Sequence, residues 1–168
     1  MSNKVSFYTH RKVDSSVLKA IVELKMQHWP HPSEAQFRWM NENINSEDVH
    51  VCVFDLFYQL IAYLNLVEVR VTGEQEEWNM IGIGNVCVDK LHLGKGLGLE
   101  IMQSVNAYLK ENSRTGLLLC RKELEGFYLK AGWLLYNGPV MLLDKPYDNL
   151  VFSTVYLKAS QLNIERNF

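Results

Sequence analysis

The sequence predicts a single domain of the α/β (α+β) class that spans residues 1–168. Three observations support this fold class. A chain of 168 residues that is 48% hydrophobic is long enough to enclose one core. The spacing of its apolar residues alternates between the period of a strand and that of a helix. An apolar strand, an amphipathic helix and a second apolar strand also follow one another directly, as in a parallel crossover unit.

The first part of the chain is predicted to form a strand and two helices. Residues 5–9 have the composition of a short strand. Ser15 can cap a helix with apolar residues at helical spacing, and this helix ends near Pro30 because proline cannot continue it. Pro32 begins a second helix that runs through Met40.

From Val49 the apolar period changes to two, which is typical of strands. We expect strands over residues 49–54, 60–71 and 78–88, joined by turns over residues 55–59 and 72–77. In the second of these strands the apolar parity slips between Leu66 and Val67. This slip indicates either burial on both faces or a bulge.

The second half contains the crossover unit and a C-terminal hairpin. The helix after Gly98 has a continuous apolar face, and residues 116–120 form an apolar run typical of a buried parallel strand. A short helix over residues 123–130 ends at Gly132. Two antiparallel strands are expected to follow, over residues 133–143 and 150–157, joined by a turn over residues 144–149.

The composition excludes several classes of function. A formal net charge of −2 gives no basic field, so we expect no binding to nucleic acid or to an anionic membrane. The three cysteines, Cys52, Cys87 and Cys120, lie in apolar stretches without a CxxC pair. They predict a reducing, cytoplasmic location and no metal site. No apolar run is long enough to cross a membrane, and no signal peptide is expected.

The turn Leu93-Gly94-Lys95-Gly96-Leu97-Gly98 is the strongest functional signal in the sequence. It stands between a strand and a helix, where the first amide N–H groups of the helix lack partners and the helix dipole favours an anion. Its spacing fits neither a P-loop nor a dinucleotide-binding fingerprint. We therefore expect this turn to bind a phosphate group.

Three segments occur in a fixed order: Val86-Cys87-Val88, then the glycine turn, then Gly126-Phe127-Tyr128-Leu129-Lys130-Ala131-Gly132-Trp133. Together they resemble the GNAT superfamily of acyl-CoA-dependent N-acyltransferases. The resemblance covers residues 49–157. It implies a mixed, mostly antiparallel sheet of about seven strands with a parallel β-α-β unit and helices on both faces. Residues 131–139 are similar, more weakly, to aminoglycoside 2'-N-acetyltransferases.

The resemblance implies that acetyl-CoA is the co-substrate. Its pantetheine would pair with the backbone of the segment from Val86 through Cys87 to Val88, and its pyrophosphate would bind the amides from Leu93 to Gly98. The sequence departs from the family pattern in two places. Leu93 replaces the usual Arg or Gln, and Arg121 stands where many members have Asn.

Acyl transfer to an amine needs a proton donor for the departing thiolate and a route for the proton of the amine. Tyr128 is the candidate donor, because a phenol and a thiol have similar pKa values. Many relatives carry a carboxylate at the position of Gly84, so the base is missing here. Glu68 is the candidate substitute, although its alternation with Arg70 also fits an exposed face that carries an ion pair. His28, His31 and unaided water stay open as further candidates.

The sequence thus predicts an acyltransferase, specifically an acetyl-CoA-dependent N-acetyltransferase that acts on a small-molecule amine, with an aminoglycoside-like polyamine as one candidate. Acidic residues at positions 42, 47 and 48 could favour a cationic acceptor. Two alternatives stay open: a non-catalytic acyl-CoA-binding module and a protein or peptide N-acetyltransferase. A homodimer is compatible with the C-terminal strands.

Overall fold

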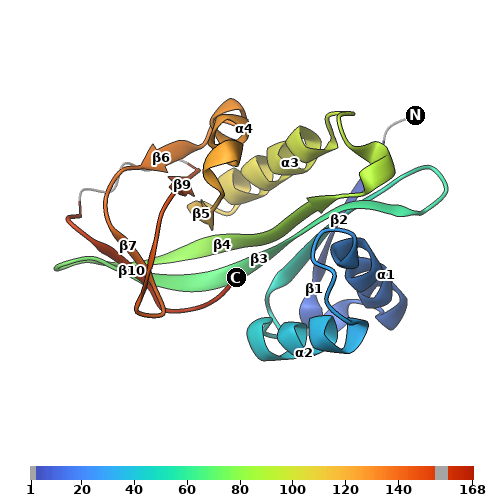
Figure 1. Cartoon of the computed structure of the whole chain (residues 1–168), viewed down its shortest axis with the longest axis horizontal. Helices are drawn as coiled ribbons and strands as arrows, with labels where there is room; N and C mark the ends of the chain where they lie inside the picture. Colours follow the sequence, from blue (N-terminus) through green and yellow to red (C-terminus); the bar gives the residue numbers. More distant parts are fainter. Residues whose placement is uncertain (1–2, 154–158) are drawn as a thin grey trace. The chain divides into compact units, whose positions relative to one another are not determined.

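The computed structural model describes residues 3–153 and 159–168, and its backbone divides into two compact units. The first unit comprises residues 1–67 and 85–104, and the second comprises residues 68–84 and 105–168. Strands β3 (Leu60–Thr72) and β4 (Glu77–Val88) and helix α3 (Leu97–Glu111) contribute residues to both units (Figure 1).

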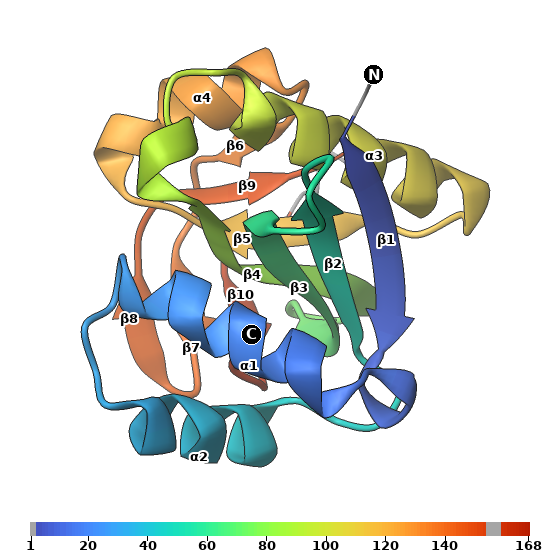
Figure 2. The same ribbon diagram turned by 90° about the vertical axis from the view of Figure 1, so that its right-hand side faces the viewer.

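The first unit contains the predicted N-terminal strand and both predicted helices. In addition to its parts of β3, β4 and α3, it contains β1 (Lys4–Thr9), α1 (Ser15–Met26), α2 (Ser33–Asn43), β2 (Val49–Phe54), and the 3-10 turns η1 (His10–Lys12) and η2 (Lys90–His92). Helices α1 and α2 pack side by side (Figure 2). Their buried residues Ile21, Leu24 and Met40 belong to the core of this unit.

Strand β2 lies between β1 and β3, antiparallel to both. The parity slip in β3 reflects burial on both faces, because every residue from Ile61 to Val67 is buried. The register shift in this part of the sheet lies elsewhere, between Val53 and Phe54 of β2. Burial on both faces therefore accounts for the slip.

The second unit contains the crossover. It holds the remaining parts of β3, β4 and α3 together with β5 (Gly116–Leu119), η3 (Lys122–Leu124), α4 (Glu125–Lys130), β6 (Leu134–Tyr136), β7 (Val140–Leu142), β8 (Lys145–Tyr147), β9 (Leu150–Phe152) and β10 (Leu162–Ile164). Its strands are hydrogen-bonded in the order β6-β9-β5-β4-β3-β10-β7-β8. Strands β4 and β5 are parallel, with Ile81 opposite Gly116, which confirms the predicted strand–helix–strand unit.

The predicted C-terminal hairpin is only partly correct. Strands β6 and β9 pair antiparallel as expected, but the first predicted strand is broken between Tyr136 and Val140, where Pro139 cannot donate a ladder hydrogen bond. Strand β7 instead forms a tight hairpin with β8, and Leu143 and Asp144 between them have φ angles of 47° and 62°. Residues 154–158 of the second predicted strand lie outside the described residues. Strand β10, parallel to β7, was not predicted and brings the described strands to ten.

Candidate functional site

The glycine turn leads into helix α3 in the first unit, and its last two residues, Leu97 and Gly98, begin the helix. The first hydrogen bond of this helix runs from the Glu100 amide to the Gly96 carbonyl at 3.0 Å. The amides of Leu97, Gly98 and Leu99 therefore lie before the first intrahelical bond and have no acceptor within the helix. This is the arrangement that the sequence predicted for an anion site.

The turn is also open toward solvent. Gly94 and Gly96 have φ angles of 76° and 81°, in the left-handed region that side chains disfavour. A Cβ atom built on either glycine would meet no atom within 4 Å. Leu93 and Lys95 are exposed, whereas Leu97 is buried and fixes the helix in the core. The backbone of the turn is therefore accessible to a ligand.

The end of β4 carries the other predicted cofactor-binding residues. Val86 and Val88 are half-buried, and Cys87 between them is buried. Asn85 directly before them has a φ of 54°, so the strand is irregular at this point. The sequence contained no signal for this irregularity, because an asparagine in a strand is not distinctive.

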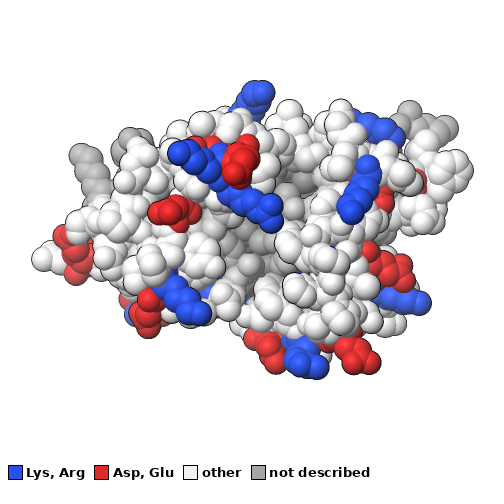
Figure 3. All heavy atoms as spheres, viewed as in Figure 1, with Lys and Arg blue, Asp and Glu red and all other residues white. Residues whose placement is uncertain are grey.

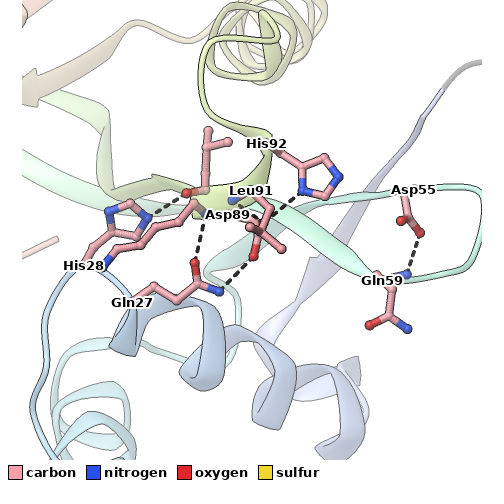
Figure 4. A network of polar contacts seen from close by, with 9 residues as sticks. Gln27, His28, Asp55, Gln59, Asp89, Leu91 and His92 are labelled. Atoms are coloured by element: carbon pink, nitrogen blue, oxygen red, sulfur yellow. Dashed lines mark hydrogen bonds and ion pairs between the residues drawn. The ribbon is translucent and has the colours of Figure 1, made fainter.

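A polar network holds the end of β4 and the start of the turn against α1 (Figure 4). His28 Nε2 lies 2.6 Å from the Val88 carbonyl oxygen, and since a carbonyl only accepts, Nε2 donates. Gln27 Nε2 donates to Asp89 Oδ2 at 2.8 Å, and Gln27 Oε1 accepts from the Lys90 amide at 2.9 Å. The candidate histidine His28 is thus engaged with the backbone of β4.

Asp89 is the centre of this network. Its Oδ1 accepts from the Leu91 amide and lies 2.9 Å from His92 Nδ1, so it caps the turn η2. Burial acts to raise the pKa of the Asp89 carboxyl, but the hydrogen bonds from Gln27, His92 and Leu91 outweigh it and lower this pKa below its usual value. Asp89 is therefore ionised when it orients the chain that leads into the glycine turn.

Tyr128, the candidate proton donor, lies in α4 of the second unit and is buried. Burial, with a smaller contribution from Cys120, raises the pKa of its phenol to about 12. The end of α4 is anchored by Asn106, which donates to the Ala131 carbonyl at 2.9 Å and accepts from Trp133 Nε1 at 2.8 Å. Tyr128 is therefore a protonated phenol on a fixed backbone.

The predicted carboxylates have partners of their own. Glu68 is exposed, and its Oε1 lies 2.7 Å from Nη2 of Arg114, as expected for the alternative of a surface ion pair. Glu47 pairs with Arg11 at 2.8 Å, and Asp48 Oδ2 accepts from the Asn45 amide at 2.6 Å. Gly84 on β4, the position at which many relatives carry a carboxylate, is buried and has no side chain.

A set of buried polar residues in the first unit was missed by the sequence reasoning. His50 is fully buried, with one ring nitrogen 2.9 Å from His10 Nδ1 and the other 2.8 Å from Tyr63 Oη. Asn65 is fully buried and accepts from Asn85 Nδ2 at 2.6 Å, and Lys25 is only 2% exposed. The spacing could have revealed Lys25, which lies four residues after Ile21 on the apolar face of α1.

His50 is neutral near pH 7. Desolvation, with a smaller effect from His10, lowers the pKa of His50 to about 4. Burial also raises the thiol pKa of Cys52 and of Cys87 to about 12, and it raises that of Cys120. All three cysteines are free.

The described part of the chain offers neither a metal centre nor a membrane span. No group of three or more His, Cys, Asp or Glu side chains in it could hold a metal ion. None of its helices is both long and apolar enough to cross a membrane. On the face shown in Figure 3, acidic and basic side chains are interspersed.

Comparison with known proteins identifies the family. The family model described as "Acetyltransferase (GNAT) domain" matches residues 9–135. The chain therefore belongs to the GNAT acetyltransferase family, whose members use acyl-CoA and acetylate amines. No curated protein sequence matches it.

Solved structures share the fold at low sequence identity. A GNAT family N-acetyltransferase (YhbS) from Escherichia coli, in complex with CoA, is 12% identical with a TM-score of 0.71 over 97% of this chain and 89% of that one. An acyl-CoA N-acyltransferase from Pseudomonas aeruginosa is 17% identical, with a TM-score of 0.66 over 91% of this chain and all (100%) of that one.

An aminoglycoside 6'-N-acetyltransferase complexed with coenzyme A is a further distant structural neighbour. It is 14% identical with a TM-score of 0.65 over 92% of this chain and 98% of that one. Identity this low shows the shared fold alone, so it does not identify the acceptor.

Proposed function

We propose that this protein is an N-acetyltransferase that moves the acetyl group of acetyl-CoA to a primary amine by direct attack on the thioester. The observation that carries the proposal is the open glycine turn at the start of α3. Three amides there precede the helical ladder, and two glycines leave their backbone uncovered. Because the chain belongs to the GNAT family, the ligand proposed for this turn is the diphosphate of acetyl-CoA.

The turn fits a diphosphate on physical grounds. Unpaired N–H groups at a helix start and the positive end of the helix dipole both stabilise an anion. A side chain at Gly94 or Gly96 would fill the space over the backbone that a phosphate needs. Leu93 lacks the charge that many relatives have, but a site built from main-chain amides does not depend on that side chain.

The end of β4 is assigned to the pantetheine and the thioester. In this proposal the Val86 amide polarises the thioester carbonyl as negative charge develops on its oxygen. The backbone of Cys87 and Val88 pairs with the pantetheine amides. Since the Val88 carbonyl already accepts from His28, it has one lone pair left for the ligand.

The chemical step then needs two proton movements. The C–N bond forms as the C–S bond breaks, and Tyr128 donates its proton to the departing thiolate. The phenol pKa of about 12 lies above that of a thiol, about 8.5, so Tyr128 stays protonated beforehand and its proton transfer to the thiolate is uphill. We do not assign the role of base to Glu68, because its carboxylate is exposed and already paired with Arg114, and we propose that water takes the proton of the amine.

The test combines binding and turnover. Calorimetry with coenzyme A should show association, and Tyr128→Phe should lower kcat much more than it weakens acetyl-CoA binding. Tyr147→Phe is the matched control, because Tyr147 is an exposed phenol on β8. An unchanged kcat in Tyr128→Phe would remove the assigned role, and no association with coenzyme A would remove the proposal.

A second candidate is a non-catalytic acyl-CoA-binding module. The observation in its favour is that Gly84 provides no carboxylate and that Glu68 is held in a surface ion pair. Binding of acetyl-CoA without release of free thiol across a panel of amines would support the module. For the transferase, we propose a small amine, an aminoglycoside or a peptide as the acceptor. The free cysteines fit a protein of a reducing compartment.

A further inference from the structure

The side chain of Lys25 is buried in the first unit, and no acidic side chain in the described part of the chain pairs with it. It is 2% exposed, and its Nζ atom lies 4.5 Å from the centroid of the Trp39 ring. No ion pair among the described residues includes Lys25. Desolvation lowers the pKa of Lys25 to about 8, and Cys87 opposes this shift. The ammonium is therefore still charged in most molecules at pH 7. Buried charges are normally paired, because removing an ion from water is costly.

A second buried donor is unsatisfied in the same unit. Asn65 on β3 is fully buried, and its Oδ1 accepts from Asn85 Nδ2. Its own Nδ2 atom has no hydrogen-bond partner among the residues that the structure describes. Only one other fully enclosed side-chain polar atom in the described residues shares this property, the hydroxyl oxygen of Thr9. An unmade hydrogen bond of this kind costs about 1–3 kcal/mol, so a partner is expected in the working protein.

His50 relates the two donors to each other. His50 on β2 and Asn65 on β3 are directly opposite each other, so their side chains share a face. The Lys25 ammonium is close enough to His50 on β2 and to Cys87 on β4 to influence the pKa of both. His50, which is opposite Asn65, and Cys87 therefore both lie within electrostatic range of the Lys25 ammonium.

We infer that the amine acceptor carries an anionic group, and that this group binds to Lys25 and Asn65. This inference rests on the proposed transferase function. A carboxylate or phosphate accepts a charge-assisted bond from the ammonium and a second bond from the amide, so it satisfies both donors at once. Cys87, which lies within electrostatic range of Lys25, stands in the sequence between the two residues assigned to the thioester and the pantetheine.

This assignment reverses the expectation of a cationic acceptor. Two of the acidic residues behind that expectation, Glu47 and Asp48, are engaged with Arg11 and with the Asn45 amide. Asp48 is buried, but its carboxylate accepts from the Asn45 amide, whereas the buried ammonium of Lys25 has no acidic partner among the described residues. An amino acid is the simplest acceptor that combines a primary amine with a carboxylate, whereas an aminoglycoside has no anionic group.

The test compares acceptors that differ only in charge. Acetyl transfer is measured with amino acids against their carboxamides, and with phosphoethanolamine against ethanolamine. The anionic member should have a kcat/KM about 10- to 100-fold higher, the range of a hydrogen bond to a charged group. The two pairs identify which anion the site prefers, and equal rates within both pairs would overturn the inference.

Lys25→Met tests the residue directly, because it keeps the apolar stem and removes the charge. The variant should lose the preference for the anionic acceptor and keep the coenzyme A affinity, and Lys25→Arg should restore part of the preference. Asn65→Leu should reduce the same preference. A preference that survives Lys25→Met would contradict the assignment, as would a variant that merely melts at lower temperature with the preference intact.

Binding provides a readout when no acceptor on the panel is turned over. The protein saturated with coenzyme A is titrated with each amino acid and with phosphoethanolamine, in the wild type and in Lys25→Met. A rise in melting temperature with an anionic amine in the wild type alone supports the inference, and no difference between the two proteins overturns it. Failure to bind coenzyme A in the first place would instead count against the proposed function.

Discussion

Substituting alanine for Gly96 separates the strain of the glycine turn from its role in binding. Gly96 has a φ of 81°, and a Cβ atom there meets nothing within 4 Å, so the only cost in the free protein is conformational. A left-handed alanine costs about 1–2 kcal/mol. For a domain of this size that lowers Tm by about 2–8 °C. If the diphosphate lies over this backbone, the added methyl group also obstructs the ligand.

The assay is thermal unfolding with and without coenzyme A. A ligand at a hundred times its Kd stabilises the folded state by about 2.7 kcal/mol, and a weakened site gives less. Gly132→Ala is the matched control, because Gly132 has a φ of 88° and equally open surroundings but lies outside the turn. Both variants should melt earlier than the wild type, and only Gly96→Ala should show a smaller rise with coenzyme A. An equal rise in all three proteins would refute the reasoning.

Three further predictions concern stability. Gly116→Ala should lower the unfolding free energy by about 1–3 kcal/mol in chemical denaturation, because its Cβ would lie 2.7 Å from Leu109 and 2.8 Å from Trp133. Asn106→Ala should cost about 1–3 kcal/mol in the same assay, since it leaves the N–H of the buried Trp133 ring without an acceptor. His50 has a pKa of about 4 when folded and about 6.5 when unfolded, so only the unfolded chain takes up its proton between these values. The unfolding free energy should fall by up to about 3 kcal/mol from pH 6.5 to pH 4, and His50→Gln should flatten this part of the profile; equal profiles would contradict the assignment.

Much of the fold could be predicted because local signals agreed with the tertiary structure. The alternation from Val49 onward and the apolar run at residues 116–120 gave the central strands and the parallel pair β4–β5. The C-terminal strands were harder, because the hairpin β7–β8 turns through Leu143 and Asp144 rather than through the Asn-Gly type of sequence that marks such turns. Short strands of three residues also leave little periodicity to detect.

The candidate site likewise contains residues that the sequence reveals and residues that it does not. Contiguous motifs such as the glycine turn are visible in sequence, because their chemistry depends on neighbouring residues. Lys25, His50 and Asn65 come from three elements that are distant in sequence, and only the strand register brings two of them opposite each other. An isolated lysine in an amphipathic helix is normally exposed, so composition favoured the wrong environment for Lys25.

The buried thiols have a practical consequence for measuring the reaction. Only the thiolate form reacts with disulfide reagents, and at pH 8 a thiol with a pKa of about 12, as in Cys52 and Cys87, is ionised in about one molecule in ten thousand. Burial also raises the thiol pKa of Cys120. A colorimetric reagent added to the native protein should therefore report the coenzyme A released at each turnover against a low background. Colour that develops without an acceptor would report acetyl-CoA hydrolysis.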